Sequence, residues 1–181
     1  MKGKLVGIIL LVALTASVLT GCDDKPMTIE EAEDFYQQNE TDIQSVIHYL
    51  KSLGYDSAGI FFGEGIYEGT NELTYHNKND FSIKRNPLKD ESIYEAAERL
   101  NKNGCHDIYY DIGTNRIEFV LGGALEVSWG IALSLDGKNL PEVAYMTTCV
   151  PMQEAGWFYY VSDYNKWRIQ QKSGTQYGPV P

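Results

Sequence analysis

The sequence has little positive charge. Its 15 Lys and Arg residues face 25 Asp and Glu residues, which gives a formal net charge of −10. Such an excess of carboxylates repels phosphates over the distances at which electrostatic steering acts. We therefore expect no nucleic acid partner, and the acidity also disfavours attraction of the whole domain to anionic lipid headgroups.

Histidine is equally scarce, because the chain has only His48, His76 and His106. His48 falls in a helical region and His76 in a polar stretch, whereas His106 is followed by Asp107 and Asp111. On a strand His106 and Asp107 would point to opposite faces, so three ligands cannot easily meet there. We expect no metal site and no cofactor, and we predict that the protein is not an enzyme. A small hydrolase using His106 with Asp107 or Asp111 is the least favoured alternative.

No apolar run is long enough to cross a bilayer as a simple helix. The uncharged run from Leu5 to Leu19 ends before Asp23, and a membrane-spanning helix needs about 20 apolar residues. Lys2 and Lys4 precede this run, and a positive start followed by a short apolar segment is typical of a secretory signal peptide. Residues 1–21 are therefore predicted to be a signal peptide.

The sequence Leu19-Thr20-Gly21-Cys22 resembles the lipobox of bacterial lipoproteins. The resemblance implies that a diacylglyceryl group is joined to the Cys22 sulfur and that cleavage follows Gly21. Two acyl chains attach a protein stably to a bilayer, since each buried methylene contributes about 0.8 kcal/mol. Residues 22–27 would then be a short tether holding the chain to the extracytoplasmic face of the cell membrane. The alternative is that Cys22 is a structural thiol.

Cysteine is also rare, and if Cys22 carries lipid only Cys105 and Cys149 remain. An even pair in an extracytoplasmic domain favours a disulfide. In the chain-entropy model a bridge of this span would stabilise the fold by about 3 to 4 kcal/mol. The competing interpretation is two separate buried thiols.

Helical patterns occupy two stretches. Thr28 and Glu31 form the pattern of a capping box, which predicts a helix start. Apolar residues then recur at helical spacing as far as Gly54, in one helix or in two with a break near Asn39. A second helix is predicted between Asp90 and Gly104.

From Cys105 onward the apolar period is two, which is typical of strands. A hairpin is predicted across 108–121, followed by strands at 125–135, 143–150 and 157–161. Sequential strands with short turns favour an α+β fold, in which two or three helices pack on one face of an antiparallel meander sheet.

The remaining stretches set the domain limits. Glycines at 59–69 indicate a bent strand pair rather than a phosphate-binding loop, because no Lys or helix start follows Gly63-Glu64-Gly65. Residues 71–87 are predicted to be mostly loop, with a short strand at 73–75. We expect one domain over 28–170 and a disordered tail at 171–181, which is polar and contains Gly and Pro.

The densest aromatic segment is 157–168. Alternation places Trp157 and Tyr159 on one strand face, and Phe158 and Tyr160 on the other. Only one of these faces can lie in the main core, and if the other is exposed its rings could stack on sugars or grip a peptide. The candidate binding residues are Phe158, Tyr160, Tyr164 and Trp167. The alternative is that Trp157 and Tyr159 fill the core while Phe158 and Tyr160 lie beneath the first helix or the tail.

The lipobox, Leu-Gly-Tyr at 53–55 and Asp-Tyr-Asn-Lys-Trp-Arg at 163–168 together resemble small lipoproteins of low-GC Gram-positive bacteria. This resemblance implies the outer face of a single membrane. The leading hypothesis is a membrane-anchored binding or interaction module whose partner is a protein, peptide or glycan. The alternative is an immunity or inhibitor lipoprotein whose acidic surface blocks a secreted toxin or lytic enzyme.

Overall fold

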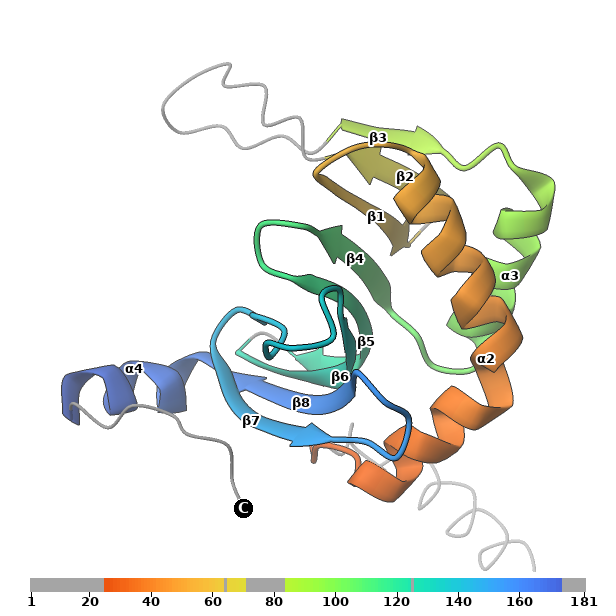
Figure 1. Ribbon diagram of the computed structural model, residues 1–181. Helices are drawn as coiled ribbons and strands as arrows, with labels where there is room; N and C mark the ends of the chain where they lie inside the picture. Colours follow the sequence, from red (N-terminus) through yellow and green to blue (C-terminus); the bar gives the residue numbers. More distant parts are fainter. Residues whose placement is uncertain (1–24, 64, 71–83, 125, 174–181) are drawn as a thin grey trace, which may run out of the picture.

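The computed structural model describes residues 25–63, 65–70, 84–124 and 126–173 (Figure 1). In chain order the elements are α2 (Ile29–Ser52), β1 (Ser57–Phe62), β2 (Ile66–Thr70), β3 (Lys84–Pro87), α3 (Glu91–Lys102), β4 (Asp107–Asp111), β5 (Arg116–Ala124), β6 (Val127–Ser134), β7 (Met146–Pro151), β8 (Trp157–Asp163) and α4 (Tyr164–Ser173). The signal peptide and the lipid attachment at Cys22 lie outside the described residues and stay predictions.

One antiparallel sheet of eight strands organises the domain, in the order β3-β2-β1-β4-β5-β6-β8-β7. The predicted α+β class and antiparallel sheet are confirmed. The sheet departs from a simple meander at two places. The chain passes through α3 from the edge strand β3 to β4, and β8 inserts between β6 and β7.

The first helical region is one continuous helix, α2. The Thr28 hydroxyl accepts from the Glu31 backbone N–H, and the Glu31 carboxylate accepts from that of Thr28, which completes the predicted capping box. Asn39 does not break the helix, because its buried amide is satisfied. Its Nδ2 donates to the Phe35 carbonyl at 2.8 Å, and its Oδ1 accepts from Asn103 at 2.7 Å.

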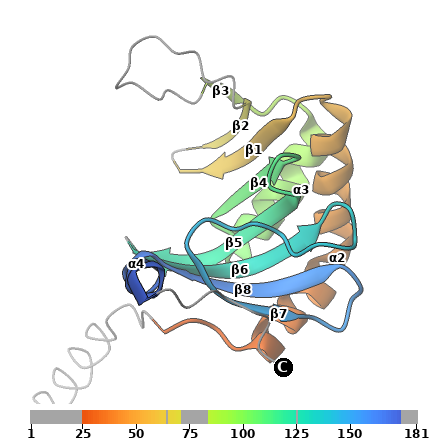
Figure 2. The same cartoon turned by 60° about the vertical axis from the view of Figure 1, so that its left-hand side comes forward.

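The main core joins α2 and α3 to alternate residues of the strands, such as Phe119 of β5 and Trp157 and Tyr159 of β8. In Figure 2 the helices α2 and α3 lie along one side of the sheet, whereas α4 lies at the far end of the strands, where β8 ends. The predicted packing of helices on one face therefore does not extend to α4. We call the face that carries Glu118 and Tyr160 the open face of the sheet.

Cys105 and Cys149 are free buried thiols, so the predicted disulfide is wrong. Strands β5, β6 and β8 separate β4 from β7, which amounts to about 19 Å at the usual strand spacing. A disulfide requires Cα atoms about 4.4 to 6.8 Å apart. Burial raises the pKa of the Cys149 thiol to about 11 and also raises the pKa of Cys105.

The ends of the domain differ from the sequence prediction. Helix α4 covers 164–173, where no helix was predicted and a tail was expected from 171 onward. Strand β3 forms within the stretch expected to be mostly loop, while a short strand expected at 73–75 lies outside the described residues. The tail at 174–181 also lies outside them. Within the described ranges, no helix is both long and apolar enough to span a bilayer.

Candidate binding cleft

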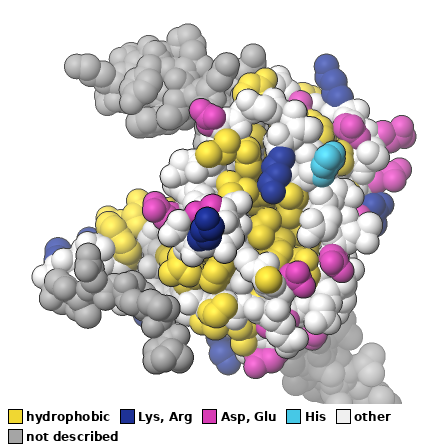
Figure 3. All heavy atoms as spheres, in the orientation of Figure 1, with side chains coloured by type: hydrophobic (Ala, Val, Ile, Leu, Met, Phe, Trp, Pro, Cys, Tyr) yellow, Lys and Arg dark blue, Asp and Glu magenta, His cyan; other side chains and the backbone are white. Residues whose placement is uncertain are grey.

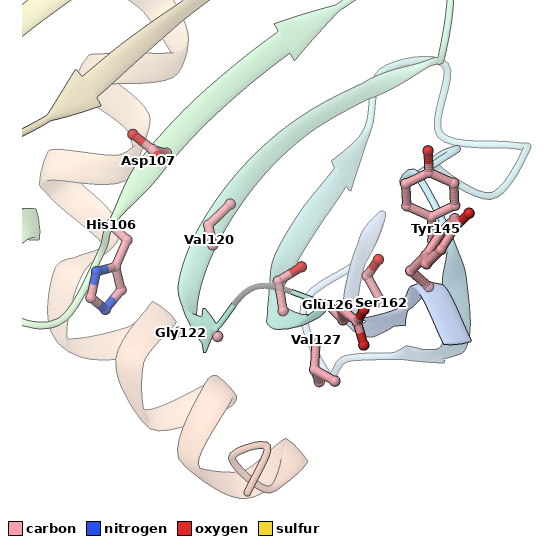
Figure 4. A pocket seen from close by; sticks show the side chains of 11 residues that line it. His106, Asp107, Val120, Gly122, Glu126, Val127, Tyr145 and Ser162 are labelled. Carbon is pink, nitrogen blue, oxygen red and sulfur yellow. The ribbon is translucent and has the colours of Figure 1, made fainter. Parts of the chain in front are cut away.

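A cleft of about 420 Å³ opens at the end of the sheet where β5 ends, β6 begins and β8 passes into α4 (Figure 4). Its walls come from segments far apart in the sequence. His106 and Asp107 lie at the start of β4, Ser162 lies near the end of β8, and Tyr145 precedes β7. The sheet order that inserts β8 between β6 and β7 therefore builds the cleft.

Two glycines, Gly122 and Gly123, line part of the cleft. The register of β5 against β6 shifts between Val120 and Gly122, which marks a β-bulge. A Cβ on Gly122 would lie 2.5 Å from the Trp129 ring. A Cβ on Gly123, whose φ is +135°, would lie 2.3 Å from the Val127 carbonyl oxygen. Side chains are thus excluded at both positions, and the backbone itself forms this wall.

The polar wall does not assemble a His–Asp pair. In Figure 4 the His106 ring points away from the Asp107 carboxylate. The His106 backbone N–H donates to the Val120 carbonyl at 2.7 Å, which fixes the chain but leaves the ring exposed. Asp111 lies at the other end of β4, where it accepts from the Thr114 N–H at 3.2 Å. The geometry does not support hydrolysis by these residues.

Two carboxylates and two serine hydroxyls are among the polar side-chain groups that line the cleft. Asp107 and Glu126 contribute the carboxylates, and Ser128 and Ser162 contribute the hydroxyls. The Ser162 hydroxyl donates to the Ala144 carbonyl, and this contact holds the chain that leads to Tyr145 against β8. The cleft therefore presents acceptors and hydroxyls with a negative local charge.

Three rings form what we call the aromatic rim: Tyr145, Tyr164 and Trp167. The Tyr145 ring makes edge contacts with Tyr164 at a centroid distance of 5.0 Å and with Trp167 at 5.1 Å. Tyr145 and Tyr164 also line the cleft. Figure 3 shows hydrophobic side chains reaching the surface where α4 leaves the domain. The rim thus joins the cleft to the exposed surface of α4.

Tyr145 has an unusual backbone for its residue type. Its φ is 56°, in the left-handed region, and its side chain is 45% exposed. Left-handed helical conformation costs an ordinary L-residue about 1 to 2 kcal/mol. The carbonyl oxygen of Tyr145 accepts from the Asp163 N–H at 3.0 Å, which holds the strained residue against the end of β8. No spacing or motif in the sequence pointed to Tyr145.

The predicted binding residues separate into two groups. Tyr164 and Trp167 meet at the rim, whereas Tyr160 is completely buried and Phe158 is half-buried. Tyr160 packs with Ala132, Val143 and Met146, and these four residues form a small second core on the open face. Tyr160 is therefore wrong as a contact residue, and the segment that covers it is 135–146 rather than α2 or the tail.

A buried charged pair lies beside Tyr160 on the open face. Arg116 Nε is 2.9 Å from the Glu118 carboxylate, and Glu118 is only 6% exposed. Burial raises the pKa of Glu118, with Arg116 opposing the shift. Burial and the neighbouring Glu118 carboxylate raise the pKa of Tyr160 well above its usual value. These residues do not line the cleft, so we assign them to packing beneath segment 135–146.

Comparison with known proteins does not assign the chain to a family. No protein-family model, curated protein or solved structure matches the chain. Among the residues that the structure describes, no group of three or more His, Cys, Asp or Glu side chains could hold a metal ion.

Proposed function

We propose that this protein is a lipid-anchored, extracytoplasmic binding module that takes a peptide or glycan in the cleft beside the aromatic rim. The observation that carries the proposal is the conformation of Tyr145. Its backbone is strained, and its exposed ring lies at the edge of the cleft. Strained backbone persists where surrounding structure enforces it, and such residues cluster at ligand sites.

The start of the domain supports a close attachment to the membrane. The Tyr159 hydroxyl donates to the Met27 carbonyl at 2.6 Å, so the described chain contacts the sheet within the predicted tether region. Only residues 23–26 then separate Met27 from the lipobox cysteine, Cys22. A module held this close would act on ligands at the membrane surface.

The cleft lining favours a neutral or cationic ligand. Asp107 and Glu126 would repel anionic groups and would accept hydrogen bonds from hydroxyls or amines. Tyr145 and Tyr164 offer flat faces for stacking on a sugar or a side chain. A volume of about 420 Å³ lies within the usual range of about 300 to 1,000 Å³ for small-ligand sites.

The test is binding of the mature lipidated chain to peptide and glycan arrays, followed by titration of each hit. We expect Tyr145→Asn to weaken binding by about tenfold, equivalent to about 1.4 kcal/mol, because Asn tolerates the left-handed backbone but provides no ring.

The matched control is Tyr55→Asn. Tyr55 is 44% exposed and lies at the far end of β4 from the cleft, beside Asp56, whose carbonyl accepts from Ile112. Binding that is lost equally in both variants, or retained in both, would contradict the assignment of the cleft.

A further inference from the structure

Helix α4 differs in charge from the other described helices. It contains Lys166, Arg168 and Lys172 and no acidic residue, within a chain whose net charge is −10. Lys166 pairs with Asp163 at 3.4 Å. Arg168 lies over the Tyr164 ring at 5.9 Å. Neither Arg168 nor Lys172 forms an ion pair with any carboxylate among the described residues, so α4 presents two uncompensated cations.

The exposed side of α4 also carries an apolar residue. Ile169 is 64% exposed, the highest value among the large hydrophobic side chains that the structure describes. Residues 168, 169 and 172 share one side of the helix, next to the side on which Trp167 packs against Tyr145. Cations beside an exposed aliphatic residue and interfacial rings are the side-chain chemistry of a membrane surface.

The predicted tether reaches the same end of the sheet as α4. Lys25, Pro26, Met27 and Thr28 lie beside Trp129 of β6. Three residues before Trp129, the backbone carbonyl of Glu126 accepts a hydrogen bond from the backbone N–H of Tyr164, the first residue of α4. At the usual strand rise these two points are about 10 Å apart. Cys22 can lie at most about 11 Å from Lys25.

We propose that α4 rests on the anionic headgroup surface of the membrane that holds the acylated cysteine, with Ile169 at headgroup level and Arg168 and Lys172 facing lipid phosphates. This inference rests on the proposed lipid anchor. The net negative charge of the chain does not prevent such a contact. The lipid tether already holds the domain at the membrane, so long-range electrostatic attraction is not needed to bring it there. Remote carboxylates are also screened over about 8 Å at physiological ionic strength.

The contact would fix the orientation of the cleft. Tyr164 belongs both to α4 and to the cleft lining. A helix held on the headgroups would therefore keep the cleft beside the membrane surface, where a membrane-bound or cell-wall ligand is found.

The experiment uses the mature lipidated chain with Ile169→Cys labelled by an environment-sensitive fluorophore. The buried thiols of Cys105 and Cys149 have raised pKa values and will react slowly, and lipid occupies Cys22. We expect a several-fold rise in fluorescence on vesicles of phosphatidylcholine with phosphatidylglycerol, and a much smaller rise on phosphatidylcholine alone. The double variant Arg168→Gln, Lys172→Gln should lose the difference between the two vesicles.

The matched control is the same label at Tyr94→Cys on α3, a residue that is 39% exposed and lies on a helix away from α4 (Figure 2). Its fluorescence should not change. Flotation of each sample with the vesicles distinguishes failure of the α4 contact from failure of the lipid anchor. Protein that floats with vesicles while the label at 169 does not respond overturns the α4 contact and leaves the anchor intact. Protein that fails to float overturns the anchor and this inference together.

Discussion

The rings of β8 and the rim rings Tyr164 and Trp167 follow one another in the sequence but differ in environment. Trp157, Tyr159 and Tyr160 are at most 7% exposed, whereas Tyr164 is 37% exposed and meets Tyr145 across the mouth of the cleft. The first group fills both sides of the sheet, and the second lies beyond its end. The aromatic residues of this region therefore have two roles, core packing in β8 and surface contact at the rim. Substitutions in the two groups should have different effects on stability and on binding.

The largest effect is expected at Tyr160. Replacing this fully buried ring by Ala should lower the free energy of unfolding by about 3 to 5 kcal/mol, because a large cavity remains between Ala132 and Val143. Tyr160→Phe should cost clearly less than Tyr160→Ala, because it keeps the buried ring and removes only the hydroxyl beside the Glu118 carboxylate. Urea unfolding measures both values. Equal losses in the two variants would show that the hydroxyl, not the ring, stabilises the open face.

An intermediate effect is expected at Asp136, which anchors the segment that covers Tyr160 and carries Tyr145. Its carboxylate accepts from the backbone N–H groups of Lys138 at 2.9 Å and Asn139 at 3.0 Å. These hydrogen bonds lower the pKa of Asp136 below its usual value of 3.8. The stabilisation is therefore complete above that value and declines as the pH falls through the folded-state pKa.

Asp136→Ala should accordingly lower the thermal midpoint at neutral pH by less than Tyr160→Ala does. The deficit should shrink on acidification below the usual pKa of 3.8. Thermal unfolding across this pH range provides the check. A deficit that grows in acid would refute the role given to the ionised carboxylate.

The smallest effect on stability is expected at Tyr145. Tyr145→Gly removes a left-handed backbone cost of about 1 to 2 kcal/mol and loses two ring contacts worth about 0.5 to 1.5 kcal/mol each. The free energy of unfolding should therefore change by about 1 kcal/mol or less, while ligand binding falls. A loss of stability as large as that of Tyr160→Ala would place Tyr145 with the packing rings.

Sequence reasoning succeeded where the signal is local. Alternation placed Trp157 and Tyr159 on one face, and both belong to the main core. The Thr28–Glu31 capping box predicted the start of α2. Such patterns depend on residues a few positions apart, so no tertiary information is needed.

The missed features depend on segments that are distant in the sequence. Tyr145 reaches the cleft only because β8 lies between β6 and β7. Tyr160 is buried by segment 135–146, which alternation within β8 cannot reveal. The cysteine count suggested a bond that the sheet order rules out. Helix α4 lacks a regular apolar stripe, so periodicity did not predict it.

We propose that the rim rings, unlike the β8 rings, form a ligand surface. Tyrosine oxidation footprinting by mass spectrometry, on isolated lipidated protein and on intact cells, tests it directly. We expect Tyr145 and Tyr164 to be oxidised in the isolated protein and protected on cells, while Tyr160 resists oxidation in both. Equal oxidation of Tyr145 in both samples would contradict the account.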